Sequence, residues 1–344
     1  MPRTAKRLEK LICASAAFLV GIYSAGCSHG AAPFSSVAGA TATSVAPQAP
    51  TPSEPAPPPE QTGGFDGAKA YDYTAKLVSF GPRPPASDAI HRTQDYLRTQ
   101  LQSFGCQVDE DDFHAQTPIG EVAMKNIVAK APGTGQGIIL LLTHYDTLRN
   151  QSPRLKTTAA SSDFVGADDA GSSSGLMLEL AQLLCAKKGE PNSVWMAFVD
   201  GEEAFVDWDS NNDNTYGSRQ LAAKMATSGE LKRVKAVMLA DMIGPYKLRI
   251  KKDQNSTPWL TEMVWKNALR LGYKDYFVSV STGVSDDHLS FLRRDVPSVD
   301  VIDLDDYPYW HTTEDTMDKI SPRSLAIVGH VFLETVNDLQ KKFR

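Results

Sequence analysis

Short, continuous apolar runs alternate with longer stretches of helical spacing over most of the chain. Three of these runs cover residues 137–143, 194–199 and 236–240, and each ends close to a charged residue or a turn. Short runs without polar alternation are typical of strands buried on both faces of a parallel sheet. The pattern predicts one more strand over 296–304, although Asp300 and Asp303 interrupt its apolar character.

The stretches before and between these runs predict helices. Their apolar residues recur at helical spacing, and Ser, Asp or Gly stands where several of the helices would begin or end. Helices are predicted over 67–80, from Ser87 or Asp88 to about 104, from 166–171 onward, from Tyr216, over 257–271, after His288 and from Ser321. Two strand-like pieces cover 106–113 and 121–131. Strands that alternate with helices predict an α/β fold class, in which one domain has a mostly parallel central sheet with helices on both faces.

The first 27 residues have the pattern of an export signal. Basic residues precede an apolar stretch over 11–23, which is too short for an ordinary membrane-spanning helix. The small residues before Cys27 resemble a bacterial lipobox, although Ser24 stands where that motif usually has leucine. We therefore expect residues 1–27 to be a signal peptide and the protein to be periplasmic or in the cell envelope, lipid-anchored at Cys27. Secretion without an anchor is the alternative.

A segment of low complexity follows the signal. Residues 28–64 are rich in Ala, Pro, Ser and Thr and contain almost no large apolar side chains. Such a segment buries too little apolar surface to offset the entropy of ordering, so it predicts a disordered tether. The folded catalytic domain is expected over 65–344.

Charge and cysteine content narrow the classes of function. The formal net charge of −6 argues against a nucleic-acid partner, because nucleic-acid-binding domains usually have a basic face. Cys106 and Cys185 are the cysteines outside the signal, and an exported protein can join them in a disulfide, but the sequence does not show whether they are close. Two cysteines do not make a zinc–thiolate site, so a metal here would have oxygen and nitrogen ligands.

Polar side chains follow the three continuous apolar runs at their carboxyl ends. His144 and Asp146 follow the first run, Glu202 and Glu203 the second, and Asp241 the third. In open α/β sheets, ligands bind beyond the carboxyl ends of the strands. Alone, Glu202 and Glu203 fit a solvated acidic turn as well as a site, and a lone histidine such as His144 is more often a hydrogen-bonded core or surface residue. The joint occurrence of these residues at three strand ends favours a site.

Two more residues complete a set with metal-binding chemistry. Asp169 lies at the start of a predicted helix and His311 lies in a late loop. A set of His, Asp and Glu without cysteine is typical of a catalytic zinc, which keeps one position open for substrate. Of two adjacent glutamates, one can bind the metal while the other moves protons.

The motifs at these positions resemble the zinc-dependent glutaminyl cyclases. These enzymes are the glutaminyl-peptide cyclotransferases of the animal and bacterial type, built on the aminopeptidase-like fold of the M28 zinc exopeptidases. The resemblance covers about 64–344 and rests on His144-Tyr-Asp146, Gly166-Ala-Asp-Asp169, Asp200-Gly-Glu-Glu-Ala-Phe205, Tyr216-Gly-Ser218, Asp241-Met-Ile-Gly244, Asp286-Asp-His288 and Trp310-His311.

The resemblance implies a role for each site residue. It implies zinc ligands at Asp169, Glu203 and His311, with Asp169 preferred to Asp168 by its spacing to the following helix. It also implies that Glu202 is the proton shuttle. Asp241 and Asp286 are implied to form a hydrogen-bonded carboxylate network beside the shuttle. The remaining implied site residues are Trp208 and Trp310 as pocket walls, and His144 and Asp146 in the place of a second-metal ligand and its orienting partner. One Zn²⁺ is expected, and two remain open.

The implied activity is conversion of the N-terminal glutamine of peptides or proteins to pyroglutamate with release of ammonia, by a monomer. Three departures from animal relatives bear on the site: Thr143 and Ser174 replace a cysteine pair, Asp300 replaces a histidine, and the loop at 305–307 is more acidic. A two-zinc M28 aminopeptidase is the main alternative. A catalytically inactive domain that serves as a binding module is the third interpretation.

Overall fold

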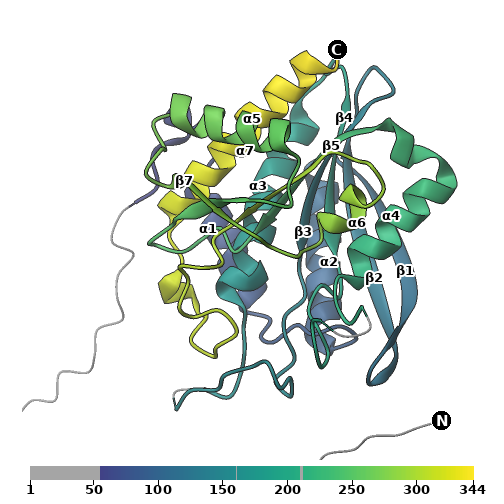
Figure 1. Cartoon of the computed structure of the whole chain (residues 1–344), viewed down its shortest axis with the longest axis vertical. Coiled ribbons are helices and arrows are strands. Elements are labelled where there is room, and N and C mark those ends of the chain that lie inside the picture. Colours follow the sequence, from purple (N-terminus) through teal and green to yellow (C-terminus); the bar gives the residue numbers. More distant parts are fainter. Residues whose placement is uncertain (1–54, 160, 210–211) are drawn as a thin grey trace, which may run out of the picture. The chain divides into compact units, whose positions relative to one another are not determined.

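The computed structural model describes residues 55–159, 161–209 and 212–344 (Figure 1). The predicted signal peptide and its lipobox cysteine lie outside the described residues, as does most of the predicted tether. Regular structure begins before residue 65, where the start of the folded domain was predicted. Pro59–Gln61 form a turn of 3-10 helix, and the fully buried Thr62 donates a hydrogen bond to the carbonyl oxygen of Phe65 at 2.6 Å.

A six-stranded mixed sheet forms the centre of the fold, with the strand order β1-β2-β4-β3-β5-β8. Its strands are β1 (Gln107–Thr117), β2 (Gly120–Ala131), β3 (Ile138–His144), β4 (Ser193–Val199), β5 (Val234–Asp241) and β8 (Ser298–Ile302). Strands β4, β3, β5 and β8 are parallel, and β1 and β2 form an antiparallel hairpin at one edge. The predicted strands and the mostly parallel central sheet are confirmed.

A second, two-stranded parallel sheet was not predicted. It pairs β6 (Ile250–Asp253) with β7 (Phe277–Thr282), next to β8. Much of β7 is exposed, and Lys251 and Lys252 occupy the middle of β6, so neither strand has the continuous apolar pattern of the central ones.

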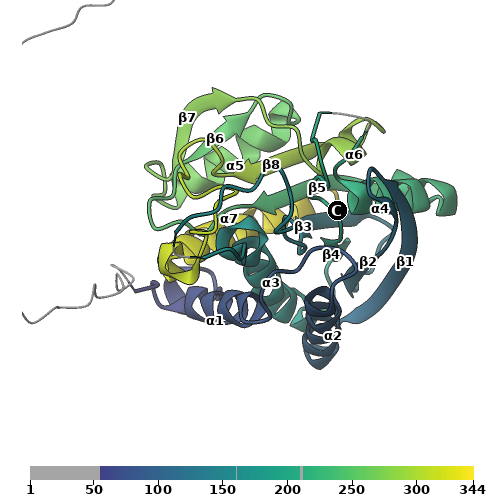
Figure 2. The same cartoon turned by 90° about the horizontal axis from the view of Figure 1, so that it is seen from below.

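Helices cover both faces of the central sheet (Figures 1 and 2). They are α1 (Gly67–Val78), α2 (Asp88–Ser103), α3 (Ser173–Ala186), α4 (Tyr216–Ser228), α5 (Pro258–Arg270), α6 (Leu289–Leu292) and α7 (Pro322–Lys342). Ser87 caps α2 by accepting a hydrogen bond from the amide of Ile90, and Ser321 caps α7 in the same way from Arg323. The predicted starts of both helices are confirmed.

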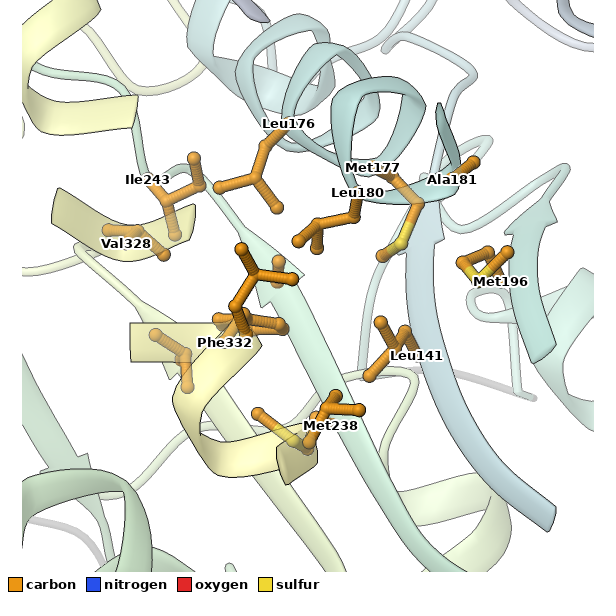
Figure 3. Close-up of a cluster of buried hydrophobic side chains, with 14 of the residues drawn as sticks. Leu141, Leu176, Met177, Leu180, Ala181, Met196, Met238, Ile243, Val328 and Phe332 are labelled. Atoms are coloured by element: carbon orange, nitrogen blue, oxygen red, sulfur yellow. The ribbon is translucent and has the colours of Figure 1, made fainter. Parts of the chain in front are cut away.

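Alternate residues of the central strands face the two helical layers. On β3, Ile139 and Leu141 pack in the larger core cluster, while Leu140 and Leu142 pack in the cluster on the opposite face with residues of α4 and α6. Figure 3 shows part of the larger cluster, where Leu176 and Leu180 of α3 and Phe332 of α7 meet the side chains of the sheet. The two-sided burial explains why these strands are apolar throughout.

A disulfide joins Cys106 to Cys185, which the sequence left open. It links the chain just before β1 to the end of α3, 79 residues later. Closing a loop of this length is worth about 4.5 kcal/mol of stability in the chain-entropy treatment. None of the helices in the described part of the chain is both long and apolar enough to span a membrane.

Candidate active site

The carboxyl ends of the parallel strands bring the predicted polar residues together. β3 ends at His144 and β5 ends at Asp241, while Glu202 and Glu203 follow the end of β4. His144 lies beside Val199 of β4 in the sheet register, so these strand ends share one edge. The placement predicted from the apolar runs is confirmed.

Asp169, Glu203 and His311 form a compact group of metal-ligand type. One candidate ligand atom from each residue lies within 4.8 Å of the others, and all three side chains are buried. The Nε2 atom of His311 lies 3.3 Å from a Glu203 oxygen and 3.5 Å from an Asp169 oxygen. Neither carboxylate oxygen of Glu203 has a hydrogen-bond partner among the described residues. Buried oxygen and nitrogen atoms that face one another in this way fit a divalent cation such as Zn²⁺.

A second group shares one residue with the first. His144, Asp169 and Asp241 also place one candidate ligand atom each within 4.8 Å of the others. The Nε2 atom of His144 lies 3.1 Å from Asp241 and 3.3 Å from Asp169. Asp169 therefore lies between two histidines, with one carboxylate oxygen directed to each.

Asp146 fixes the two adjacent glutamates through their backbone. Its carboxylate accepts a hydrogen bond from the amide of Glu202 at 3.1 Å and from that of Glu203 at 3.3 Å. Gly201, which precedes them, has φ = 70°, and a Cβ there would lie 2.6 Å from Met124 Sδ. The turn after β4 therefore requires glycine at this position. Asp146 orients both glutamates as well as His144, whose Nδ1 atom lies 3.5 Å away.

Asp315 plays the corresponding part for the turn that contains Asp169, and sequence reasoning missed it. Its two carboxylate oxygens accept hydrogen bonds from the amides of Asp168 and Asp169 at 2.9 and 3.1 Å, and the hydroxyl of Tyr307 donates to it. Asp168 instead directs a carboxylate oxygen to the amide of Gly244, away from the ligand group. The choice of Asp169 over Asp168 as the ligand is therefore supported.

Glu202 and Asp286 line the same cavity as the ligand group of Asp169, Glu203 and His311. The cavity has a volume of about 360 Å³. Trp208, Trp310 and the apolar side chains of Val284, Ile302 and Leu304 contribute to its walls. Trp310 also stacks on His311, with ring centroids 4.4 Å apart. All the residues predicted for catalysis and substrate binding thus meet in one place.

The carboxyl groups of the cavity raise one another's pKa. Burial raises the pKa of Glu202 well above its ordinary value; His144 lowers it, and Asp286 and Glu203 raise it further. Burial raises the pKa of Asp286 in the same way, with Asp241 as the next cause. Burial lowers the pKa of His311, but the carboxylates of Glu203 and Asp169 outweigh this effect and the net shift is upward. The cavity therefore has a negative potential that favours a cation.

Three of the residues that the resemblance marks as departures, Thr143, Ser174 and Asp300, are buried, whereas Asp305 and Asp306 of the acidic loop are exposed. The hydroxyl of Ser174 donates to the carbonyl oxygen of His144, and that of Thr143 donates to Ser173. Asp300 is fully buried on β8, 3.8 Å from Nδ1 of His288. The implied hydrogen-bonded network of Asp241 and Asp286 does not form among the described residues: Asp241 is hydrogen-bonded to His144, and Asp286 accepts a hydrogen bond from the amide of Asp287.

The loop before residue 160 supplies a cavity residue that sequence reasoning missed. Arg154 lines the cavity between the two tryptophans. The sequence alone contains no signal for which residue of this loop reaches the site.

Comparisons with known proteins agree with this fold. The model of peptidase family M28 matches residues 126–336, a range that includes every candidate metal ligand named above. A Zn-dependent exopeptidase from Parabacteroides distasonis has a similar structure, with a TM-score of 0.70 at 28% identity, covering 79% of this chain and 98% of that one. The fold is thus the aminopeptidase-like fold of the zinc exopeptidases.

Two further similarities are more specific. The glutaminyl-peptide cyclotransferase of Gloydius blomhoffii is 32% identical over 298 residues, which are 74% of this chain and 78% of that protein. The crystal structure of a glutaminyl cyclase from an Acidobacteriales bacterium has a TM-score of 0.74 at 37% identity and covers 86% of this chain and all of its own. The chain belongs to peptidase family M28 and, within it, to the glutaminyl-peptide cyclotransferases.

Proposed function

We propose that this chain converts the N-terminal glutamine of peptides or proteins to pyroglutamate and releases ammonia. The observation that carries the proposal is the shared cavity, in which Glu202 faces the same space as the ligand group of Asp169, Glu203 and His311. The relatives named as glutaminyl cyclases support it.

Asp169, Glu203 and His311 would hold the metal, and the M28 family and its zinc-dependent exopeptidase relative suggest that this metal is Zn²⁺. When bound, Zn²⁺ supplies a Lewis acid for the oxygen of the γ-amide. The carboxylate oxygens of Glu203 are buried and have no hydrogen-bond partner among the described residues, which supports this site as the one that binds the first metal ion. One ion is proposed.

Glu202 would move the proton that the reaction has to relocate. The α-amine attacks the γ-amide carbon of its own residue, so a carbon–nitrogen bond forms and closes the ring while the bond to the amide nitrogen breaks. The Glu202 carboxylate accepts a proton from the attacking amine and returns it to the leaving nitrogen, which departs as ammonia. Because the nucleophile belongs to the substrate, no water molecule has to be activated.

The surroundings of Glu202 suit both halves of this transfer. A carboxylate with an ordinary pKa is a weak base and, once protonated, gives its proton up quickly to bulk water. Burial, Asp286 and Glu203 raise the pKa of Glu202 and thus make it a better base. The backbone hydrogen bond from Glu202 to Asp146 holds it in place during both steps.

Trp208 and Trp310 would hold the glutamine side chain against the ligand group. Trp310 stacks on His311, and Trp208 lines the same cavity. The apolar walls exclude water from the reacting amide, which strengthens the electrostatic effects of the cavity.

Product analysis of a Gln-initiated peptide tests the proposal. A purified chain loaded with Zn²⁺ should release one ammonia per peptide and leave a peptide with a blocked N-terminus, and a chelator should abolish both. Peptide bond cleavage without ammonia release would reject the proposal.

The shared Asp169 supports a second candidate, a two-zinc aminopeptidase. His144, Asp169 and Asp241 form a group that fits a second cation beside the first. Such an enzyme would release free amino acids from peptide N-termini, with Glu202 activating a water molecule. Liberation of free glutamine from the same peptide distinguishes the two. An inactive binding module would bind no metal and show neither product, and the complete ligand set argues against it.

We also propose that the protein is exported, anchored at Cys27 and monomeric. The Cys106–Cys185 disulfide supports export, because such bonds persist mainly in oxidising compartments. Metabolic labelling with a fatty acid, with Cys27→Ser as the control, tests the anchor.

A further inference from the structure

A guanidinium group lies between the two tryptophan walls of the cavity. The Cζ atom of Arg154 is 5.6 Å from the ring centroid of Trp208 and 6.0 Å from that of Trp310, so it stacks against rings from two different loops. Trp310 is 36% exposed, whereas Asp169 and Glu203 are buried, which places Arg154 at the mouth of the cavity. Among the described lining residues, Arg154 is the only lysine or arginine.

The backbone just after Arg154 is fixed relative to the ligand group, and a local hydrogen bond orders the turn before it. The amide of Arg154 donates to Ser152 Oγ at 3.2 Å. Two residues later, the amide of Lys156 donates to the carbonyl oxygen of His311 at 2.8 Å, and the amide of Thr313 donates back to Lys156. The positive charge therefore has a defined place with respect to the reacting amide.

This guanidinium has no acidic partner in the described part of the chain, although six carboxylates line the cavity: Asp169, Glu202, Glu203, Asp209, Asp241 and Asp286. No ion pair joins Arg154 to any of them, and its buried Nε atom has no hydrogen-bond acceptor among the described residues. A guanidinium is a rigid fork of donors that matches a carboxylate in two-point geometry. Aromatic rings hold the Arg154 side chain in place while its guanidinium N–H groups have no acidic partner, so Arg154 is suited to bind a carboxylate of a ligand.

We propose that Arg154 determines substrate specificity by binding a carboxylate on the residue that follows the N-terminal glutamine. The inference rests on the proposed function: with the glutamine amide at the buried end beside Glu202, the next residue leaves through the mouth, past Arg154. The carboxylate has two sources, an acidic side chain in the second position or the terminal carboxylate of a dipeptide.

Matched substrates test this in the full-length enzyme. kcat/KM is measured for Gln-Glu amide against the isosteric Gln-Gln amide, and for Gln-Gly against Gln-Gly amide. The variants are Arg154→Gln, Arg154→Lys and the control Lys156→Gln, which removes a charge from an exposed side chain of the same loop. The wild type should favour the carboxylate-bearing member of at least one pair by about fivefold, the size of a well-formed exposed ion pair.

Arg154→Gln should abolish that preference, Arg154→Lys should retain part of it, and Lys156→Gln should leave it unchanged. A preference confined to the first pair assigns the carboxylate to the side chain, and one confined to the second pair assigns it to the chain end. The proposal is overturned if the wild type treats both members of each pair alike, or if Arg154→Gln lowers kcat/KM equally for all substrates. Absence of ammonia release from every substrate would instead reject the proposed function.

Discussion

The buried end and the mouth of the cavity are built in different ways. At the buried end, Asp146 and Asp315 hold the two turns that carry Glu202, Glu203 and Asp169, and each accepts two backbone hydrogen bonds from its turn. At the mouth, Arg154 and Trp310 meet mainly through ring contacts, and Trp310 is partly exposed. The fold thus sets the positions of the residues proposed for the reaction. The substrate preference depends instead on loop side chains, which can be replaced without disturbing the buried end of the cavity.

The largest effect is expected from removing a ligand at the buried end. His311→Ala should release the metal and reduce turnover by about 10³-fold or more, because a Lewis acid is worth several kcal/mol and each 1.36 kcal/mol is a factor of ten. Metal content and ammonia release measure the two effects. His114→Ala, on β1 outside the cavity, is the control and should retain both. A His311→Ala variant with full metal content would remove His311 from the ligand set.

A smaller effect is expected from the carboxylate that holds the turn of Asp169. Asp315→Asn should weaken metal binding by about 10- to 100-fold, as outer residues of metal sites usually do, and excess Zn²⁺ should restore activity. Titration of the apoprotein with Zn²⁺ measures the affinity. The neighbouring Glu314 is exposed, and Glu314→Gln should leave the affinity unchanged. Equal affinities for both variants would show that the backbone bonds of Asp315 do not matter for the site.

The coupling of Glu202 to Asp286 should appear in the pH profile. A base must be deprotonated, so kcat should fall as the pH decreases through the pKa of Glu202, at a midpoint above the ordinary glutamate value of 4.5. The charge of Asp286 raises that pKa, so Asp286→Asn should move the midpoint to lower pH. Asp305→Asn, in an exposed loop, serves as the control. A midpoint that moves up in Asp286→Asn would contradict the assignment.

The smallest effect is expected at the mouth. Trp208→Ala should raise KM by up to about fivefold with little change in kcat, because it removes a stacking wall and a cation–π contact. Steady-state kinetics with a Gln-initiated peptide separate the two constants. A large loss of kcat or of metal would mean that the mouth and the buried end are not independent.

The sequence predicted the buried end better than the mouth for a physical reason. His144 and Asp241 end apolar strands, and Glu202 and Glu203 follow one, so the topology of a parallel sheet brings them together whatever the loops do. Arg154 lies in a long loop, and nothing in a single sequence tells where such a loop folds.

Contacts between residues that lie far apart in the chain could also not be predicted from the sequence. Asp315 accepts hydrogen bonds from amides about 146 residues away in the chain. Nothing in the sequence indicates which backbone amides a given carboxylate will contact. The Cys106–Cys185 disulfide required knowledge of a distance that only the fold supplies. Asp300 interrupts the apolar pattern of its strand. Its carboxylate lies beside the buried His288, a contact that the apolar pattern does not reveal.

The assignment of separate tasks to Glu202 and Glu203 is the central claim, and Glu202→Gln tests it most directly. The variant keeps the shape of the side chain and the backbone bond to Asp146 but loses the base. Measured together, metal content should equal that of the wild type while ammonia release falls by about 10²- to 10⁴-fold. Loss of the metal along with activity, or turnover close to the wild-type rate, would contradict the account.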